Sequence, residues 1–155
     1  MGIIVKVGET APDFDGPTWN GTRLGLKDFV GKKNVVLYFY PKDDTPGCTK
    51  EACSFRDNLR SIRDLGTEIV GVSLDSVESH RKFATKYALP FPLVTDEDKR
   101  IANAYGVLRE TGNRTQRVTF LIDKNGKIAK IFPKVDVTSH TEEILAALKE
   151  LSSTA

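Results

Sequence analysis

The sequence has few of the residues that build disulfide scaffolds or metal sites. Its 155 residues include two cysteines, two histidines, one tryptophan and one methionine. Two cysteines are too few for a secreted domain held together by disulfides. A structural zinc site needs about four ligands, and the histidines, His80 and His140, lie on separate predicted helices. We therefore expect no metal and no other cofactor.

Long apolar runs and a strong charge bias are also lacking. No run approaches the roughly 18 apolar residues of a membrane-spanning helix, and the first residues lack the pattern of a signal or transit peptide. The net charge is +2, with acidic and basic residues interspersed, which does not favour nucleic-acid binding. We expect a cytoplasmic protein that binds neither membrane nor nucleic acid.

Apolar runs and turn signals alternate along the chain as in α/β proteins. The stretch 9–22 is rich in turn residues, 89–94 is expected to be extended, and Asn125-Gly126 predicts a tight hairpin turn. Strands are predicted at 34–40, 67–73, 117–122 and 127–132, and helices at about 49–65, 77–87, 96–105 and 140–151.

This order predicts a mixed central sheet flanked by helices on both faces. Strands joined by helices come first, and a hairpin followed by a helix comes last. Together with an N-terminal β-hairpin extension, the order indicates a thioredoxin-like α/β fold. A chain of this length fits one domain, so we expect residues 1–155 to form a single domain.

Cys48 lies where a predicted strand passes into a predicted helix, within the stretch 41–53 (PKDDTPGCTKEAC). Unpaired N–H groups and the helix dipole at a helix N-terminus favour an anion. A thiolate is such an anion, and it is the reactive form of cysteine. The Thr-Pro-Gly turn before Cys48 predicts an exposed position for this residue.

Three further residues are candidates for the same site. Arg117 begins a predicted strand, and neighbouring strand ends often meet in one cleft, where a guanidinium stabilises developing negative charge. Thr45 places a hydroxyl near the sulfur, and Pro41 walls one side. Asp43 and Asp44 would oppose a thiolate, so we expect both to point to solvent.

Cys48 and Cys53 are too far apart for a disulfide if both lie on one intact helix. Helical residues five positions apart have Cα atoms roughly 8 to 9 Å apart, beyond the limit of about 7 Å for a disulfide. A bond between them therefore requires the helix to unwind. Simpler interpretations remain open: buried apolar cysteines, a surface arginine at 117, an ordinary turn threonine at 45, and a helix-surface His80.

The pattern Pro41-x-x-x-Thr45-x-x-Cys48 resembles the active-site motif of the peroxiredoxins. The wider stretch 38–57 is similar to the peroxiredoxin Q subgroup, also called bacterioferritin comigratory protein. Further similarity lies in the segments 8–14, 73–83, 91–96 and 117–123.

The resemblance implies a thiol peroxidase for hydrogen peroxide and alkyl hydroperoxides. Cys48 would be the peroxidatic cysteine and Cys53 the resolving cysteine, with Pro41, Thr45 and Arg117 in support. Thioredoxin or a similar dithiol protein would reduce the resulting disulfide, and we expect a monomer. A redox sensor or holdase that uses the same cysteines, and a metal-binding module, are the alternatives.

Overall fold

A five-stranded mixed sheet forms the centre of the computed structural model, which describes residues 2–153. The strands lie in the order β5-β4-β3-β6-β7. The strands are β1 (Gly16–Pro17), β2 (Arg23–Leu24), β3 (Asn34–Phe39), β4 (Thr67–Ser73), β5 (Leu93–Thr95), β6 (Val118–Ile122) and β7 (Ile128–Phe132). The helices are the 3₁₀ helix η1 (Leu26–Asp28), α1 (Pro46–Asp57), α2 (Leu59–Asp64), α3 (Val77–Tyr87), α4 (Arg100–Tyr105) and α5 (His140–Ser153).

The topology confirms the predicted thioredoxin-like arrangement. Strands β3, β4 and β5 are parallel, whereas β6 is antiparallel to both β3 and β7. The β6–β7 turn closes with a hydrogen bond from the Gly126 amide to the Asp123 carbonyl oxygen, 2.9 Å. Near the N-terminus, β1 and β2 pair as a short antiparallel hairpin, as expected.

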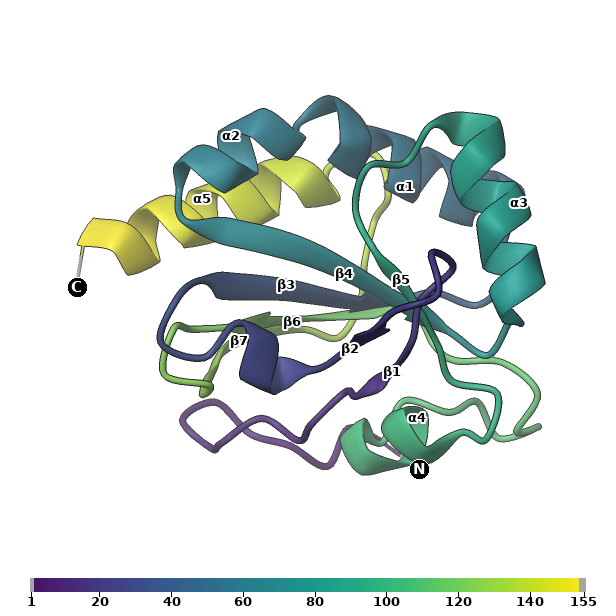
Figure 1. Cartoon of the computed structure of the whole chain (residues 1–155). Coiled ribbons are helices and arrows are strands. Elements are labelled where there is room, and N and C mark those ends of the chain that lie inside the picture. Colours follow the sequence, from purple (N-terminus) through teal and green to yellow (C-terminus); the bar gives the residue numbers. More distant parts are fainter. Residues whose placement is uncertain (1, 154–155) are drawn as a thin grey trace.

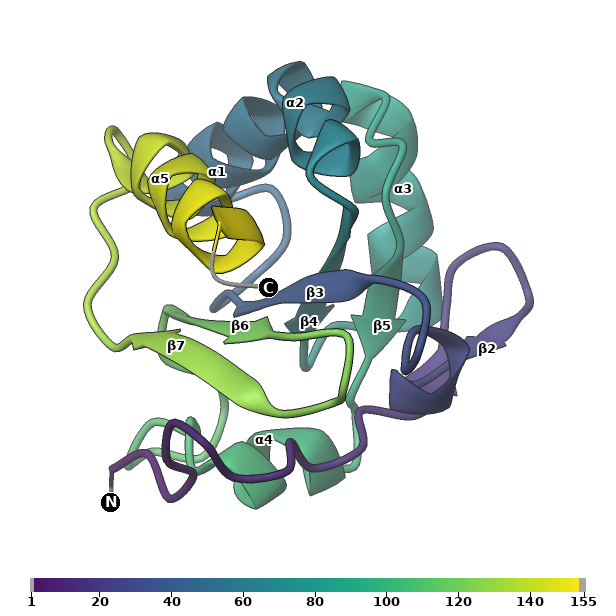
Figure 2. The same ribbon diagram turned by 90° about the vertical axis from the view of Figure 1, so that its left-hand side faces the viewer.

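Helices cover both faces of the sheet (Figures 1 and 2). Helices α1, α2, α3 and α5 lie over one face, while α4 and the N-terminal segment lie over the other. All six residues of β3 are buried. Because side chains alternate along a strand, Val36 and Tyr38 pack under the four helices, whereas Val35, Leu37 and Phe39 pack on the opposite side.

Two predicted helices have different bounds in the structure. The predicted helix at 49–65 begins three residues earlier, at Pro46, and is divided at Asn58. The Asn58 side chain donates to the Ser54 carbonyl oxygen, 2.8 Å. The helix predicted from residue 96 begins at Arg100, because the Asp96 carboxylate instead accepts the amides of Ile101 and Ala102, at 3.0 and 2.8 Å.

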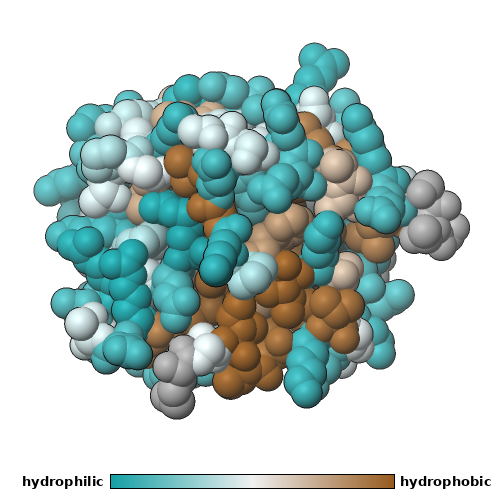
Figure 3. Space-filling view, turned by 180° about the vertical axis from the view of Figure 1, so that it is seen from behind, coloured by the Kyte–Doolittle hydropathy of each residue, from teal (hydrophilic) through white to brown (hydrophobic). Residues whose placement is uncertain are grey.

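The surface is mostly polar, with apolar side chains gathered in one area of the face shown in Figure 3. Among the described residues, the large apolar side chains with high exposure are those of Ile4, Val7 and Val30. Within residues 2–153, no helix combines the length and the apolar composition needed to cross a bilayer.

Candidate active site

Cys48 is the third residue of α1, after Thr45 at the N-cap and Pro46 at the first position. Pro is well suited to the first helical position, where its missing N–H costs nothing. The buried residues of α1 recur at helical spacing: Cys48, Glu51, Ala52 and Phe55. Cys48 is therefore on the inward face and only 1% exposed. The predicted exposed position of this cysteine is wrong, because the helix begins before it.

Arg117 lies against the sulfur of Cys48. It directly precedes β6, whose first residue Val118 pairs with Phe39, the last residue of β3. This register brings Arg117 to the end of the sheet where α1 begins. Its Nη2 is 3.3 Å from Cys48 Sγ. The two residues that the sequence proposed as partners thus meet, although they are 69 positions apart.

Glu51 completes a charged group that the sequence analysis missed. Arg117 Nη1 donates to Glu51 Oε1 at 2.8 Å, and the carboxylate is 1% exposed. Burial raises the pKa of Glu51 to about 7, opposed by the positive charge of Arg117. Within the described residues, Glu51 Oε2 has no hydrogen-bond partner. Its position three residues after Cys48, on the same helix face, was the signal available in the sequence.

Tyr38 lies beneath this group with its hydroxyl unpaired among the described residues. Its ring is 1% exposed, and burial together with the charges of Glu51 and Cys48 raises the Tyr38 pKa well above its ordinary value. The phenol therefore stays neutral at physiological pH. Cys48, Glu51 and Tyr38 are thus buried together, and Arg117 is the cation that contacts the sulfur.

Gly47 leaves room for Arg117 beside the first turn of α1. A Cβ atom at position 47 would lie 3.0 Å from Arg117 Nη2, which is tighter than ordinary van der Waals contact. A larger residue would require the guanidinium to shift by a few tenths of an ångström. The glycine in the Thr-Pro-Gly-Cys stretch thus serves the placement of Arg117.

Thr45 and Pro41 belong to the loop that connects β3 to α1. The Thr45 hydroxyl donates to the Lys42 carbonyl oxygen at 2.9 Å and forms no cap hydrogen bond with α1. Pro41 is buried. The functions assigned to Thr45 and Pro41 remain predictions.

The two aspartates of this loop behave differently from each other. Asp44 is exposed as expected, and its carboxylate accepts Lys86 Nζ at 2.8 Å and Tyr87 Oη at 2.7 Å. Asp43 was expected at the surface, but it is buried and accepts hydrogen bonds from Tyr40 and Ser79. The expectation failed because these hydroxyls, one of them on α3, replace water around the carboxylate.

His80 is also buried, contrary to the expectation of a helix-surface residue. Its ring nitrogens pair with Ser73 Oγ at 2.8 Å and Thr95 Oγ1 at 3.0 Å. Burial lowers the pKa of His80 to about 4, so the ring is neutral at pH 7. Asp43, Asp75 and His80 hold ligand atoms within 4.8 Å of one another, but these groups already hydrogen-bond within the protein.

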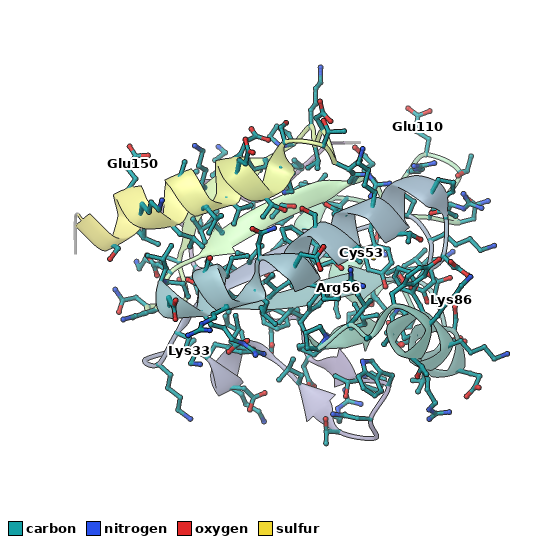
Figure 4. The ribbon with its side chains drawn as sticks, turned by 90° about the horizontal axis from the view of Figure 1, so that it is seen from above. Lys33, Cys53, Arg56, Lys86, Glu110 and Glu150 are labelled. Atoms are coloured by element: carbon teal, nitrogen blue, oxygen red, sulfur yellow. The ribbon has the colours of Figure 1, made fainter. Side chains whose placement is uncertain are left out.

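Cys53 lies on the other side of α1 from Cys48 and is partly exposed. Both cysteines are free thiols in the structure. Seen from above the helical layer, Cys53 and Arg56 lie close together on α1 (Figure 4). Arg56 Nη1 donates to the Tyr87 carbonyl oxygen of α3 at 2.7 Å. Since α1 is an intact helix, the two sulfurs cannot bond in this conformation.

The buried carboxyl groups predict how stability depends on pH. Burial raises the pKa of Glu51 and of Asp43 to about 7 each, so the folded chain binds protons that the unfolded chain has released. We expect the free energy of unfolding to fall between about pH 4 and pH 7, by on the order of 1 to 3 kcal/mol per group. Denaturant titrations should show a shallower fall in Glu51→Gln; an unchanged pH dependence would contradict the assignment.

Comparison with known proteins places these residues in a family. The model of the AhpC/TSA family matches residues 7–131. A protein of Coxiella burnetii (strain RSA 493 / Nine Mile phase I) named putative peroxiredoxin bcp is 47% identical over 93% of this chain and 99% of its own. Peroxiredoxin Bcp of Bacillus subtilis (strain 168) is 44% identical over 97% of this chain and 99% of its own.

Solved structures agree with the sequence relatives. The crystal structure of peroxidoxin BcpB from Mycobacterium tuberculosis has a TM-score of 0.88 at 35% identity, covering 95% of this chain and 98% of the other. Peroxiredoxin Q of Xanthomonas campestris has a TM-score of 0.86 at 35% identity, covering 97% and 98%. The chain therefore belongs to the AhpC/TSA family, in its group of Bcp and peroxiredoxin Q proteins.

Proposed function

We propose that this chain reduces hydrogen peroxide and alkyl hydroperoxides with Cys48 as the peroxidatic cysteine. The observation that carries the proposal is the contact between Cys48 Sγ and Arg117 Nη2 at 3.3 Å. A thiolate at the start of a helix, beside a permanent cation, is stabilised as a nucleophile. The relatives named above are peroxiredoxins, and one Xanthomonas campestris homologue is described for its alkyl peroxide reduction.

The first step transfers an oxygen atom from peroxide to sulfur. The Cys48 thiolate attacks the terminal oxygen of the hydroperoxide, so that an S–O bond forms and the O–O bond breaks. The products are the sulfenic acid and water or an alcohol, once the departing oxygen has taken up a proton. Arg117 remains charged at any physiological pH, and its donors favour the negative charge that develops on the oxygen atoms.

The second step forms a disulfide within the chain. The Cys53 thiol attacks the sulfenic sulfur, releases water and forms the Cys48–Cys53 bond. Because an intact helix keeps the Cα atoms too far apart, the first turns of α1 unwind before this step. Rapid resolution also limits the competing oxidation to sulfinic acid, which is irreversible in most proteins.

A dithiol protein then reduces the disulfide and completes the cycle. Thioredoxin has the required chemistry, since thiol–disulfide exchange passes both electrons to the Cys48–Cys53 bond. We infer a monomeric protein that works in the cytoplasm, where reducing systems regenerate thiols. In this view Thr45 and Pro41 form the wall against which the peroxide binds.

Mass spectrometry of the reduced chain tests the proposal. One equivalent of hydrogen peroxide should convert the chain to a form about 2 Da lighter, with peptide mapping linking Cys48 to Cys53, as the loss of two hydrogens in a disulfide requires. Thioredoxin and its reductase should restore the reduced mass. A chain that keeps both thiols after peroxide treatment would refute the proposed function.

A further inference from the structure

The loop of residues 41–45 is fastened to α3 through the carboxylate of Asp43. Asp43 is 7% exposed. Its Oδ1 accepts the Tyr40 hydroxyl at 2.6 Å, and its Oδ2 accepts the Ser79 hydroxyl of α3 at 2.8 Å. Its backbone amide donates to Asp75 Oδ2 at 2.9 Å. One residue of the loop therefore makes three buried or partly buried hydrogen bonds.

A second layer of hydrogen bonds anchors this attachment to the sheet. Ser73 Oγ is 2.7 Å from Asp75 Oδ2 and 2.8 Å from His80 Nε2. The carboxylate can only accept, so the Ser73 hydroxyl donates to Asp75, and His80 Nε2 carries the proton that Ser73 accepts. The other ring nitrogen then accepts the Thr95 hydroxyl of β5 at 3.0 Å. The chain of hydrogen bonds runs from β5 to the loop.

Burying the Asp43 carboxylate costs free energy, and its hydrogen bonds do not involve the Cys48 sulfur. A buried carboxylate is tolerated only when hydrogen bonds replace its hydration. Arg117, which is itself paired with Glu51, donates to Cys48 Sγ, whereas the hydrogen bonds of Asp43 go to other residues. Asp43 instead lies midway along the loop, two residues after Pro41 and two residues before Thr45.

The first turn of α1, which follows Thr45, is held by backbone hydrogen bonds of the helix and not by the side chain of Asp43. The Thr49 amide donates to the Thr45 carbonyl oxygen at 2.8 Å, which is a bond of the first helical turn. Disulfide formation in the proposed reaction must break such bonds, whereas the Asp43 bonds lie outside the helix. The chain therefore contains a boundary between a fixed loop and a helix that has to unwind.

We propose that Asp43 is a positioning residue: its carboxylate pins the 41–45 loop to α3, so that Pro41 and Thr45 are held around Cys48 in the reduced chain and stay in place when the first turns of α1, with Cys48, unwind. The inference rests on the proposed function, since it assigns a place to two residues of that site. It predicts that unwinding begins after Thr45 and does not spread into the loop.

Three variants test the proposal. Asp43→Asn replaces an acceptor oxygen by an amide that opposes the hydroxyls of Tyr40 and Ser79. Ser79→Ala removes one donor with little change in volume, so the fold should survive even if Asp43→Asn is unstable. Asp44→Asn is the matched control: the Asp44 carboxylate also pairs with side chains of α3, Lys86 and Tyr87, but it is exposed, and pairs at the surface contribute little.

The rate of peroxide reaction gives the first measurement. We expect the second-order rate constant of Cys48 with hydrogen peroxide to fall about tenfold or more in Asp43→Asn and several-fold in Ser79→Ala. Asp44→Asn should stay within about twofold of the wild type. If all three variants react at the wild-type rate, the carboxylate does not position the loop.

Amide exchange followed by NMR gives the second measurement, which a general loss of stability would not reproduce. In the oxidised wild type, the Thr49 amide should exchange about tenfold faster or more, while the Asp43 amide keeps its protection. In oxidised Asp43→Asn, both should exchange rapidly. Equal acceleration at both amides in the wild type would overturn the inference.

The two proposals can fail separately. A wild-type chain that does not react with peroxide refutes the proposed function. Amide exchange in the reduced wild type, Asp43→Asn and Asp44→Asn would still show whether Asp43, rather than Asp44, holds the loop. A wild-type chain that reacts normally, beside Asp43 variants that match it in rate and exchange, refutes the positioning role alone.

Discussion

Replacing Cys48 by serine should abolish peroxidase turnover. A hydroxyl is not ionised near neutrality, and beside Arg117 it cannot supply the nucleophile that the thiolate provides. We expect the rate of thioredoxin-dependent peroxide consumption to fall to the background of the reductase system. Coupled oxidation of NADPH measures this rate directly, and the unchanged circular dichroism of Cys48→Ser would show that the fold is intact.

Cys53→Ser is the informative partner variant. It should still consume about one equivalent of peroxide per chain, because the attacking sulfur is untouched, and then stall with thioredoxin as donor. High peroxide should drive this variant to sulfinic acid, 32 Da above the thiol by the addition of two oxygens. If Cys53→Ser turned over at the wild-type rate, the resolving role of Cys53 would be wrong.

Arg117→Ala should produce the second largest effect. Loss of one preorganised donor to developing negative charge typically costs about 10² to 10³ in rate, and we expect kcat/KM for hydrogen peroxide to fall by that factor. Stopped-flow oxidation of the reduced chain measures it. Arg117→Lys should recover only part of the rate, because an ammonium lacks the fork that contacts Cys48 and Glu51 together.

A matched control separates catalysis from folding in this experiment. Arg117→Ala alone leaves the Glu51 carboxylate buried without a partner, which is destabilising. The double variant Arg117→Ala/Glu51→Gln removes that charge and should regain stability without regaining rate. Gly47→Ala should slow the reaction as well, since its Cβ displaces the guanidinium. If the double variant regained the reaction rate together with its stability, Arg117 would act only by stabilising the fold.

Much of the fold was predictable because its signals are local. After Asn34, the run at 34–40 is apolar or aromatic at every position, as a strand buried on both faces must be, and Asn125-Gly126 marked the β6–β7 turn. The division of the helix at Asn58 was not visible, because helical spacing continues through it. The start of α4 was misplaced because Asp96 caps the helix from four residues before it.

The site was predictable where chemistry is confined to one short stretch. Cys48 was indicated by its place at a helix start. Arg117 was proposed from its place at a strand end, and the resemblance favoured that role over a surface arginine and gave Cys53 its role. Asp43 and His80 were misjudged because their partners come from α3, β4 and β5, and no local pattern reveals that hydroxyls will replace water there. Glu51 was overlooked because a glutamate in a helix is usually solvated.

That residues 1–155 form a single domain, that the chain is monomeric and that it works in the cytoplasm all remain predictions. Gel filtration at several protein concentrations addresses the second of them.

The nearly complete enclosure of the Cys48 sulfur makes the site selective by size. A small local fluctuation of the protein is enough to let a small oxidant reach the sulfur. A bulky alkylating reagent requires a much larger local opening. Cys53, which is partly exposed, lacks this shelter. Bulky labelling reagents should thus modify the Cys53 thiol faster than the Cys48 thiol, although both lie on one helix. Burial, and not intrinsic reactivity alone, then determines which thiol each reagent modifies.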